Sequence, residues 1–154
     1  MKLLAEQSTT IRCDVRTVFA YASNMENFSQ WFPGVRSIVS ANALQPTEPG
    51  KEYLEVVATP AGEERQVLVR VRQVEPDRLF VTEGEYPPLL PRMEILFRAE
   101  GANECAITWR MFSRNDAPES ELSWLPIARG AIRERAEAGV AQLKMRLESA
   151  LLRS

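Results

Sequence analysis

The sequence of 154 residues contains no histidine. This absence excludes Ser-His-Asp triads, Cys-His nucleophiles and histidine-based metal sites. Cysteine is scarce as well, because Cys13 and Cys105 are the two in the chain and they lack the CxxC spacing of metal and redox motifs. No glycine-rich phosphate loop, acidic metal cluster or dinucleotide-binding fingerprint is present. We therefore expect no metal and no cofactor, and chemistry limited to Asp, Glu, Arg, Lys, Tyr, Cys or ordered water.

An excess of charge of one sign is also lacking. Nineteen basic and 21 acidic residues leave a net charge of −2, and the two signs alternate along the chain, so we expect no nucleic-acid partner. The first residues run straight into Glu6 and Gln7 without the apolar stretch of a secretory signal. No run approaches the ~18 apolar residues that span a bilayer. We expect a cytoplasmic chain with no integral membrane segment and with both cysteines as buried free thiols.

What is present is the composition of one ordinary soluble domain, with 45% hydrophobic and 26% charged residues. A chain of this length buries about two-thirds of the surface that it exposes when unfolded. No internal repeat, linker or low-complexity tract divides it. We expect residues 1–154 to form a single domain with room for a core and a pocket.

Hydrophobic periodicity divides the chain into three parts. Residues 3–13 predict a first strand, after which Asp14 caps a short helix and Asn24 begins a second one. From about Pro126 to the end, a helical period predicts one long C-terminal helix. Between these parts, short alternating runs predict six strands at residues 35–42, 51–59, 64–75, 78–86, 92–100 and 104–113. The predicted fold class is α+β.

This order of elements resembles the helix-grip fold of the SRPBCC superfamily. The local sequence supports the resemblance in three places: the segment Ile11 to Tyr21 with its Val-Phe pair, the segment Asn24 to Asn27, and the turn Trp31-Phe32-Pro33-Gly34-Val35. The superfamily contains START lipid-transfer domains, birch-pollen-allergen-like proteins and polyketide cyclase/dehydratase-like proteins. The resemblance implies a seven-stranded curved antiparallel sheet wrapped around the long C-terminal helix, with two short helices after strand 1. It is a fold signature and names no reaction.

Hairpin register predicts which side chains face the C-terminal helix. A two-residue loop at Pro76-Asp77 pairs Val71, Val69 and Val67 with Thr82, Gly84 and Tyr86. A three-residue loop at Gly101-Ala102-Asn103 pairs Phe97, Ile95 and Met93 with Ile107, Trp109 and Met111. In the hairpin through Pro60 to Glu63, we expect Glu55 to face outward and Leu54, Val56 and Ala58 to face inward.

Arg65 and Tyr86 are the polar pair that we expect at the end of an apolar cavity. An arginine can hold a carboxylate, phosphate or enolate oxygen, and a phenol can donate one oriented hydrogen bond. The alternative is that Arg65, close to a hairpin turn, extends into water. The other candidate ligand-binding residues are apolar or small, and residues of these types more often serve core packing: Thr82, Val67, Val69, Phe97, Ile95, Met93, Trp109, Met111, Gly139 and Leu143.

Two further features leave alternatives open. Gly84 and Gly139 give either space for a ligand or close packing of helix on sheet. The proline-rich segment 87–91, which contains Leu89 and Leu90, could be a lid, a partner contact or a cover for the core.

Three functions compete. The resemblance implies binding of a hydrophobic small molecule such as a lipid, quinone or polyketide-like aromatic, and the apolar inner face favours this interpretation. The first alternative is a polyketide cyclase, aromatase or dehydratase, in which a cation such as Arg65 stabilises an enolate. The second alternative is a protein-interaction module of the chaperone-activator type. The sequence leaves open whether the chain forms a homodimer.

Overall fold

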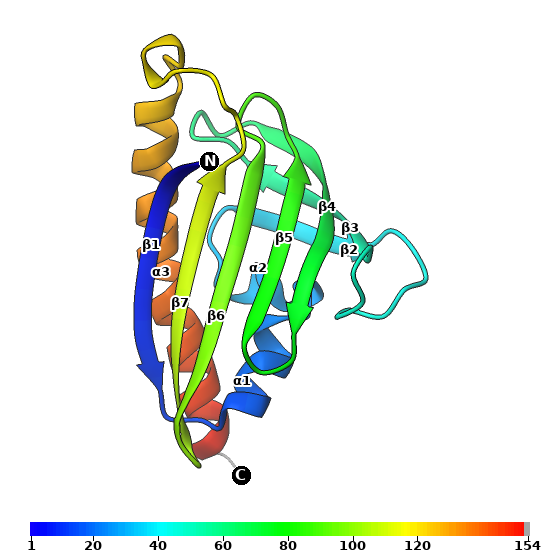
Figure 1. Ribbon diagram of the computed structural model, residues 1–154, viewed down its shortest axis with the longest axis vertical. Coiled ribbons are helices and arrows are strands. Elements are labelled where there is room, and N and C mark those ends of the chain that lie inside the picture. Colours follow the sequence, from blue (N-terminus) through cyan, green and yellow to red (C-terminus); the bar gives the residue numbers. More distant parts are fainter. Residues whose placement is uncertain (153–154) are drawn as a thin grey trace.

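A seven-stranded antiparallel sheet with the strand order β1-β7-β6-β5-β4-β3-β2 dominates the computed structural model, which describes residues 1–152 (Figure 1). The strands are β1 (Lys2–Ile11), β2 (Val35–Ser40), β3 (Glu52–Ala58), β4 (Glu64–Glu75), β5 (Leu79–Glu85), β6 (Pro91–Gly101) and β7 (Glu104–Ser113). The helices are α1 (Val15–Ala22), α2 (Phe28–Trp31) and α3 (Leu125–Leu152), with single 3-10 turns at η1 (Met25–Asn27) and η2 (Glu119–Glu121).

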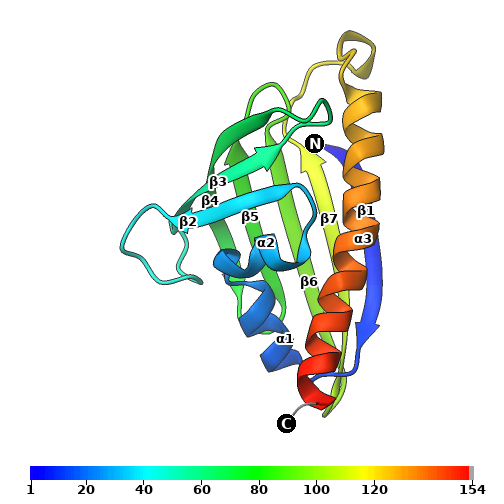
Figure 2. The same cartoon turned by 180° about the vertical axis from the view of Figure 1, so that it is seen from behind.

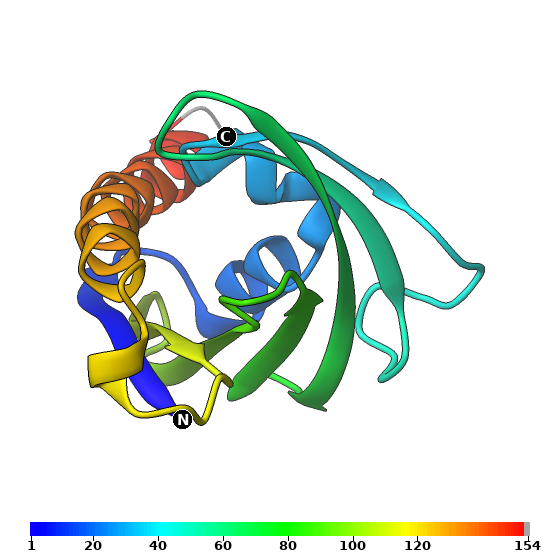
Figure 3. The same cartoon turned by 90° about the horizontal axis from the view of Figure 1, so that it is seen from above.

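The sheet curves into an arc that the helices close. Helix α3 runs along β1 at one end of the arc (Figure 2). Helix α2 contacts both β2, at the other end, and α3, so the view from above shows a nearly closed ring (Figure 3). The predicted helix-grip architecture and the α+β fold class are confirmed.

Local sequence signals explain where the helices begin. The carboxylate of Asp14 accepts a hydrogen bond of 3.0 Å from the backbone N–H of Thr17, which is the N-cap geometry predicted for α1. Pro126 is the second residue of α3, where a missing N–H costs no helical hydrogen bond. No helix among residues 1–152 combines the length and apolar character that crossing a membrane requires.

Two of the three predicted pairs of the β4–β5 hairpin are confirmed, the third lies beyond the end of β5 at Glu85, and the loop is longer than predicted. Val71 lies opposite Thr82 and Val69 opposite Gly84. Near the turn, Glu75 pairs with Leu79, which leaves three loop residues, and Asp77 adopts a left-handed φ of 62°. A bulge between Val71 and Gln73 then restores the predicted register.

In the β6–β7 hairpin the loop is shorter than predicted, and an irregularity in the strand again restores the predicted pairing. The predicted pairs of Met93, Ile95 and Phe97 with Met111, Trp109 and Ile107 are confirmed. However, Gly101 pairs with Glu104, so the loop has two residues and the irregularity lies between Ala99 and Gly101.

The predicted orientation of β3 is wrong for Leu54, Glu55 and Val56, whereas Ala58 at the end of the strand is buried and lines the cavity, in agreement with its predicted inward position. Glu55 pairs with Val67 and faces inward with Tyr53, which is fully buried, whereas Leu54 and Val56 are half-buried on the outer side. The outer face is fixed by a 2.6 Å ion pair between Glu52 and Arg70. Arg70 is also the cross-strand neighbour of Glu83, but its guanidinium binds Glu52. Glu83 forms ion pairs with Arg72 at 3.2 Å and with Arg92 at 2.9 Å.

The core fills the lower part of the ring. Phe32 stacks on Trp109 with a ring-centroid distance of 5.2 Å, and Phe19 meets Phe97 edge to face at 5.1 Å. Cys13 and Cys105 are both buried free thiols. Burial is the main cause that raises their pKa values. Beside the first turns of α3, the core leaves a space unfilled.

Candidate functional site

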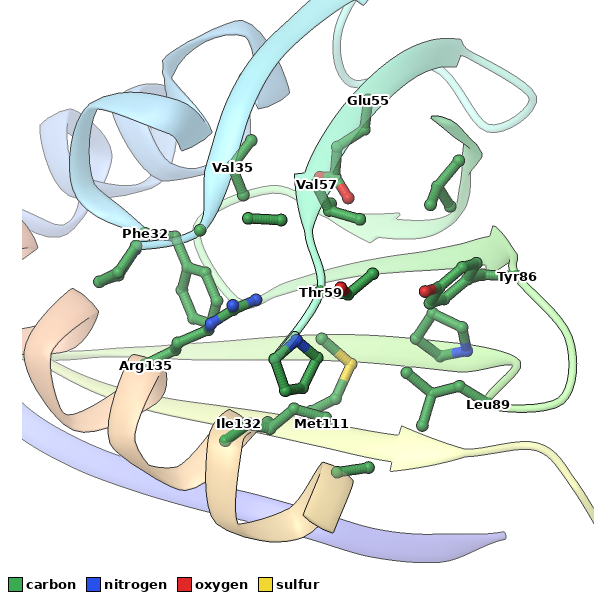
Figure 4. Close-up of a pocket in the computed structure, with 18 of the residues that line it drawn as sticks. Phe32, Val35, Glu55, Val57, Thr59, Tyr86, Leu89, Met111, Ile132 and Arg135 are labelled. Atoms are coloured by element: carbon green, nitrogen blue, oxygen red, sulfur yellow. The ribbon is translucent and has the colours of Figure 1, made fainter. Parts of the chain in front are cut away.

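A cavity of about 490 Å³ lies between the inner face of the sheet and the first turns of α3 (Figure 4). Its walls come from α2 with the turn after it, the first residue of β2, β3 with the loop after it, one residue each of β4, β6 and β7, the loop before β6, and α3 with the residue before it. The lining residues are Phe28, Phe32, Pro33, Gly34, Val35, Glu55, Val57, Ala58, Thr59, Pro60, Ala61, Val67, Tyr86, Pro87, Pro88, Leu89, Pro91, Met111, Trp124, Ile127, Ala128, Ala131, Ile132 and Arg135.

The structure places three of the predicted ligand-binding residues, Val67, Tyr86 and Met111, on the wall of this cavity. Arg65 lies outside the lining: its side chain is 49% exposed and forms an ion pair with Glu63. The alternative interpretation of Arg65 as a residue extending into water is therefore the correct one. The remaining predicted residues are buried away from the cavity: Thr82, Val69, Phe97, Ile95, Met93, Trp109, Gly139 and Leu143.

Both glycines of the inner surface serve close approach. A Cβ at Gly139 would be 2.9 Å from Phe32 Cδ2 and 3.3 Å from the backbone oxygen of Trp31, so α3 packs directly on α2 there. A Cβ at Gly84 would be 3.1 Å from side-chain atoms of both Val67 and Pro91. Gly84 thus allows two wall residues to pack over the sheet, and Gly139 contributes no free volume.

Glu55 brings a carboxyl group into the cavity from β3. In the sheet it lies between Ile38 of β2 and Val67 of β4, and both of these neighbours are buried apolar residues. Glu55 is 9% exposed and has no hydrogen bond or ion pair within residues 1–152. Burial disfavours its charged form and raises the pKa of Glu55 to about 7.

Arg135 brings a guanidinium into the same cavity from α3. Its side chain extends past Phe32 toward Thr59 (Figure 4). The guanidinium lies against Gly34, whose φ of 86° and missing Cβ leave room for it. Arg135 is half-buried and has no ion-pair partner in the described part of the chain.

The loop from Tyr86 to Pro91 forms a fixed wall. Its backbone is held to the end of β7 and to the segment after it. Asn115 Nδ2 donates to the Pro88 carbonyl at 3.0 Å, and the N–H of Arg114 donates to the Leu90 carbonyl at 2.8 Å. The hydroxyl of Ser113 donates to the carbonyl of Leu89. These bonds point the Leu89 side chain to the cavity, which accounts for an apolar residue in a loop (Figure 4).

Sequence reasoning missed both charged residues of the cavity, although signals for them existed. An ion pair of Glu52 with Arg70 would have placed Glu52 outside and, by alternation, Tyr53 and Glu55 inside. Arg135 lies three residues after Ile132 and directly before Ala136, at the edge of the apolar stripe of α3.

The cavity can bind a molecule of mainly apolar surface and can offer it one proton-exchanging group and one fixed cation. Among the lining residues, Glu55, Tyr86 and Arg135 carry titratable side chains. No group of three or more acidic or cysteine side chains within the described residues is arranged to hold a metal ion.

Solved structures share this fold over nearly the whole chain. A protein from Thermus thermophilus is 13% identical, with a TM-score of 0.73 and coverage of 95% of this chain and 97% of that one. A START superfamily protein from Mycobacterium smegmatis is 13% identical, with a TM-score of 0.67 and coverage of 95% and 97%. The di-domain ARO/CYC protein StfQ from the steffimycin biosynthetic pathway is 13% identical, with a TM-score of 0.67. This chain covers 50% of StfQ, and 95% of this chain is covered.

A search of curated proteins found no match. The family model described as polyketide cyclase/dehydrase and lipid transport matches residues 3–148. This match confirms the resemblance to the SRPBCC superfamily, and it supports a hydrophobic-ligand-binding or polyketide-cyclase-type role without deciding between the two. The chain belongs to the polyketide cyclase/dehydrase and lipid transport family.

Proposed function

We propose that this protein binds a hydrophobic small molecule, as a carrier or sequestering protein, in the cavity between the sheet and α3. The observation that carries the proposal is the cavity itself, whose volume of about 490 Å³ lies within the range of small-molecule sites and whose lining is mostly apolar. A mostly apolar cavity of this size leaves its lining side chains with fewer packing contacts than a filled core would give them, and a bound hydrophobic ligand supplies those contacts.

The family description agrees with ligands of this class, and so does the likeness to an ARO/CYC protein, because lipids and polyketides are both hydrophobic. The fixed loop wall at Leu89 and the close packing at Gly139 keep the cavity shape without a ligand. We expect binding to need little reorganisation of the chain.

The experiment compares two alanine-to-phenylalanine variants on α3. Ala131 lines the cavity, whereas Ala138 is exposed on the same helix. N-phenylnaphthylamine is a neutral apolar probe whose fluorescence increases when it leaves water. We expect the wild type and Ala138→Phe to bind it equally and Ala131→Phe to bind at least about tenfold more weakly, since the new ring occupies the cavity.

Circular dichroism and unfolding midpoints of the two variants verify that both are folded. Equal affinity of Ala131→Phe and Ala138→Phe would contradict binding in this cavity, and absence of binding to the wild type would contradict the proposed function.

A second candidate function is a cyclase or dehydratase acting on a poly-β-carbonyl chain. Glu55 favours it, because a carboxyl group with a pKa near 7 can donate or accept a proton at neutral pH. The test is turnover of a short poly-β-carbonyl thioester. We expect the wild type to turn this compound over faster than the uncatalysed reaction, and Glu55→Gln to lose that activity while it still binds N-phenylnaphthylamine. Turnover that is unchanged in Glu55→Gln would contradict a role for this residue.

A further inference from the structure

Two charged residues face the cavity from opposite walls, and neither has a charged partner within residues 1–152. Glu55 enters from β3 and Arg135 from α3 (Figure 4). Two other cations of α3 are paired with carboxylates, Arg129 with Glu119 at 2.7 Å and Lys144 with Glu148 at 2.8 Å. Arg135 is thus a cation that the fold holds at the cavity without neutralising it.

The charge of Arg135 selects among ligands. A half-buried guanidinium attracts an anionic oxygen and can hold it through two parallel hydrogen bonds. The same guanidinium repels an amine that would enter the cavity to pair with Glu55. A ligand cation is therefore disfavoured, even though a lone carboxylate could accommodate one.

Glu55 must respond when a ligand replaces water in the cavity. Its neighbours across the sheet, Ile38 and Val67, are apolar, and the titratable groups that share the cavity with it are Tyr86 and Arg135. An apolar ligand surface over the carboxyl group removes its remaining solvation, which favours the neutral acid. Binding and proton uptake at Glu55 are then coupled.

We infer that the ligand is a hydrophobic acid, whose anionic group pairs with Arg135 and whose uncharged body covers Glu55 in its protonated form. This inference rests on the proposed function, and it names the chemical class of the ligand for the same cavity. The anion and the guanidinium neutralise each other, so the filled cavity carries no net charge.

The first arm of the test uses three probes with the same ten-carbon chain and different head groups: decanoic acid, decanol and decylamine. Each displaces N-phenylnaphthylamine from the wild type, and we expect the acid to bind tightest and the amine weakest. Arg135→Met should lose at least about tenfold in affinity for decanoic acid and change little for decanol. Arg133→Met, exposed on the same helix, should match the wild type.

The second arm measures proton uptake with decanol, which has no titratable group of its own. Calorimetric titrations near pH 7.5, in two buffers of different ionisation enthalpy, should report uptake of a fraction of a proton by the wild type. Glu55→Gln should show no uptake and should bind decanol at least as tightly as the wild type, because glutamine resembles the protonated acid that the bound state favours.

The outcomes separate the two levels of the account. If N-phenylnaphthylamine and all three ten-carbon probes fail to bind the wild type, the proposed function is wrong. If they bind but the acid has no advantage over the alcohol, if the amine binds tightest, or if Arg135→Met behaves like Arg133→Met, the inference about an acidic ligand is overturned. Absence of proton uptake by the wild type would overturn the part that concerns Glu55.

Discussion

The guanidinium of Arg135 rests on Gly34, so closely that a Cβ at residue 34 would be 2.6 Å from Arg135 Cζ. Gly34 lies in the turn after α2, and Arg135 lies in the second half of the chain on α3. This contact fixes the position of the cation at the cavity, because the side chain has no ion pair within residues 1–152 to hold it.

Gly34→Ala should therefore displace Arg135. We expect the variant to lose the preference for decanoic acid over decanol and to be destabilised by about 1–2 kcal/mol, because alanine is strained at a φ of 86°. The matched control is Gly62→Ala, since Gly62 has the same φ of 86° but no atom within 4 Å of its added Cβ. The control should show the strain in urea unfolding and keep the ligand preference, and loss of the preference in both variants would refute the role of the Gly34 contact.

Glu55 should make the protein less stable as the pH rises. Its pKa is raised from 4.5 to about 7 in the folded state, so between these values the folded protein binds more protons than the unfolded chain. Stability then decreases with rising pH across this window, by on the order of 3 kcal/mol in total. Glu55→Gln removes the effect. It should equal the wild type near pH 4 and be more stable by about that amount at pH 8, as measured by urea unfolding. An equal difference at both pH values would show that burial does not shift Glu55.

The two glycines of α3 should respond to alanine in opposite directions. Gly130 is exposed with no atom within 4 Å of an added Cβ, so Gly130→Ala should stabilise the protein by up to about 1 kcal/mol through helix propensity. At Gly139 the added Cβ would be 2.9 Å from Phe32, and overpacking should outweigh the same gain by about 1 kcal/mol or more. Thermal unfolding of the two variants is the comparison, and stabilisation by Gly139→Ala would contradict the close packing of α3 on α2.

The fold could be predicted from the sequence because most of its signals are local. Asp14 carries the N-cap of α1 in its own side chain, and period-two runs mark the strands wherever one face is buried. Bulges carry no such signal. The shift between Val71 and Gln73 depends on how a three-residue loop meets a twisted pair of strands, which alternation alone does not determine.

The site was less predictable because a charged residue in a strand normally faces water. Glu55 violates that rule, and assigning it outward reversed the predicted faces of Leu54 and Val56 as well, since a shift of one residue exchanges the two faces of a strand. The prediction for Arg65 was wrong for the opposite reason. Its position in the strand lies beside Val57 of the cavity wall, but its long side chain turns away from the cavity to Glu63. Tyr86 and Met111 lie on the cavity wall, as predicted, because the alternation of apolar residues around them indicates which side chains face inward.

The position of a bound ligand tests the central claim most directly, and the methionines provide the reporters. Met111 lines the cavity, Met93 is its buried cross-strand neighbour, and Met145 is exposed on α3. In protein labelled at the methionine methyl groups, titration with decanoic acid followed by NMR should shift the Met111 signal strongly and leave the Met145 signal in place. Met111→Leu assigns the signal. A Met111 signal that stays unchanged while the acid binds would contradict a ligand in this cavity.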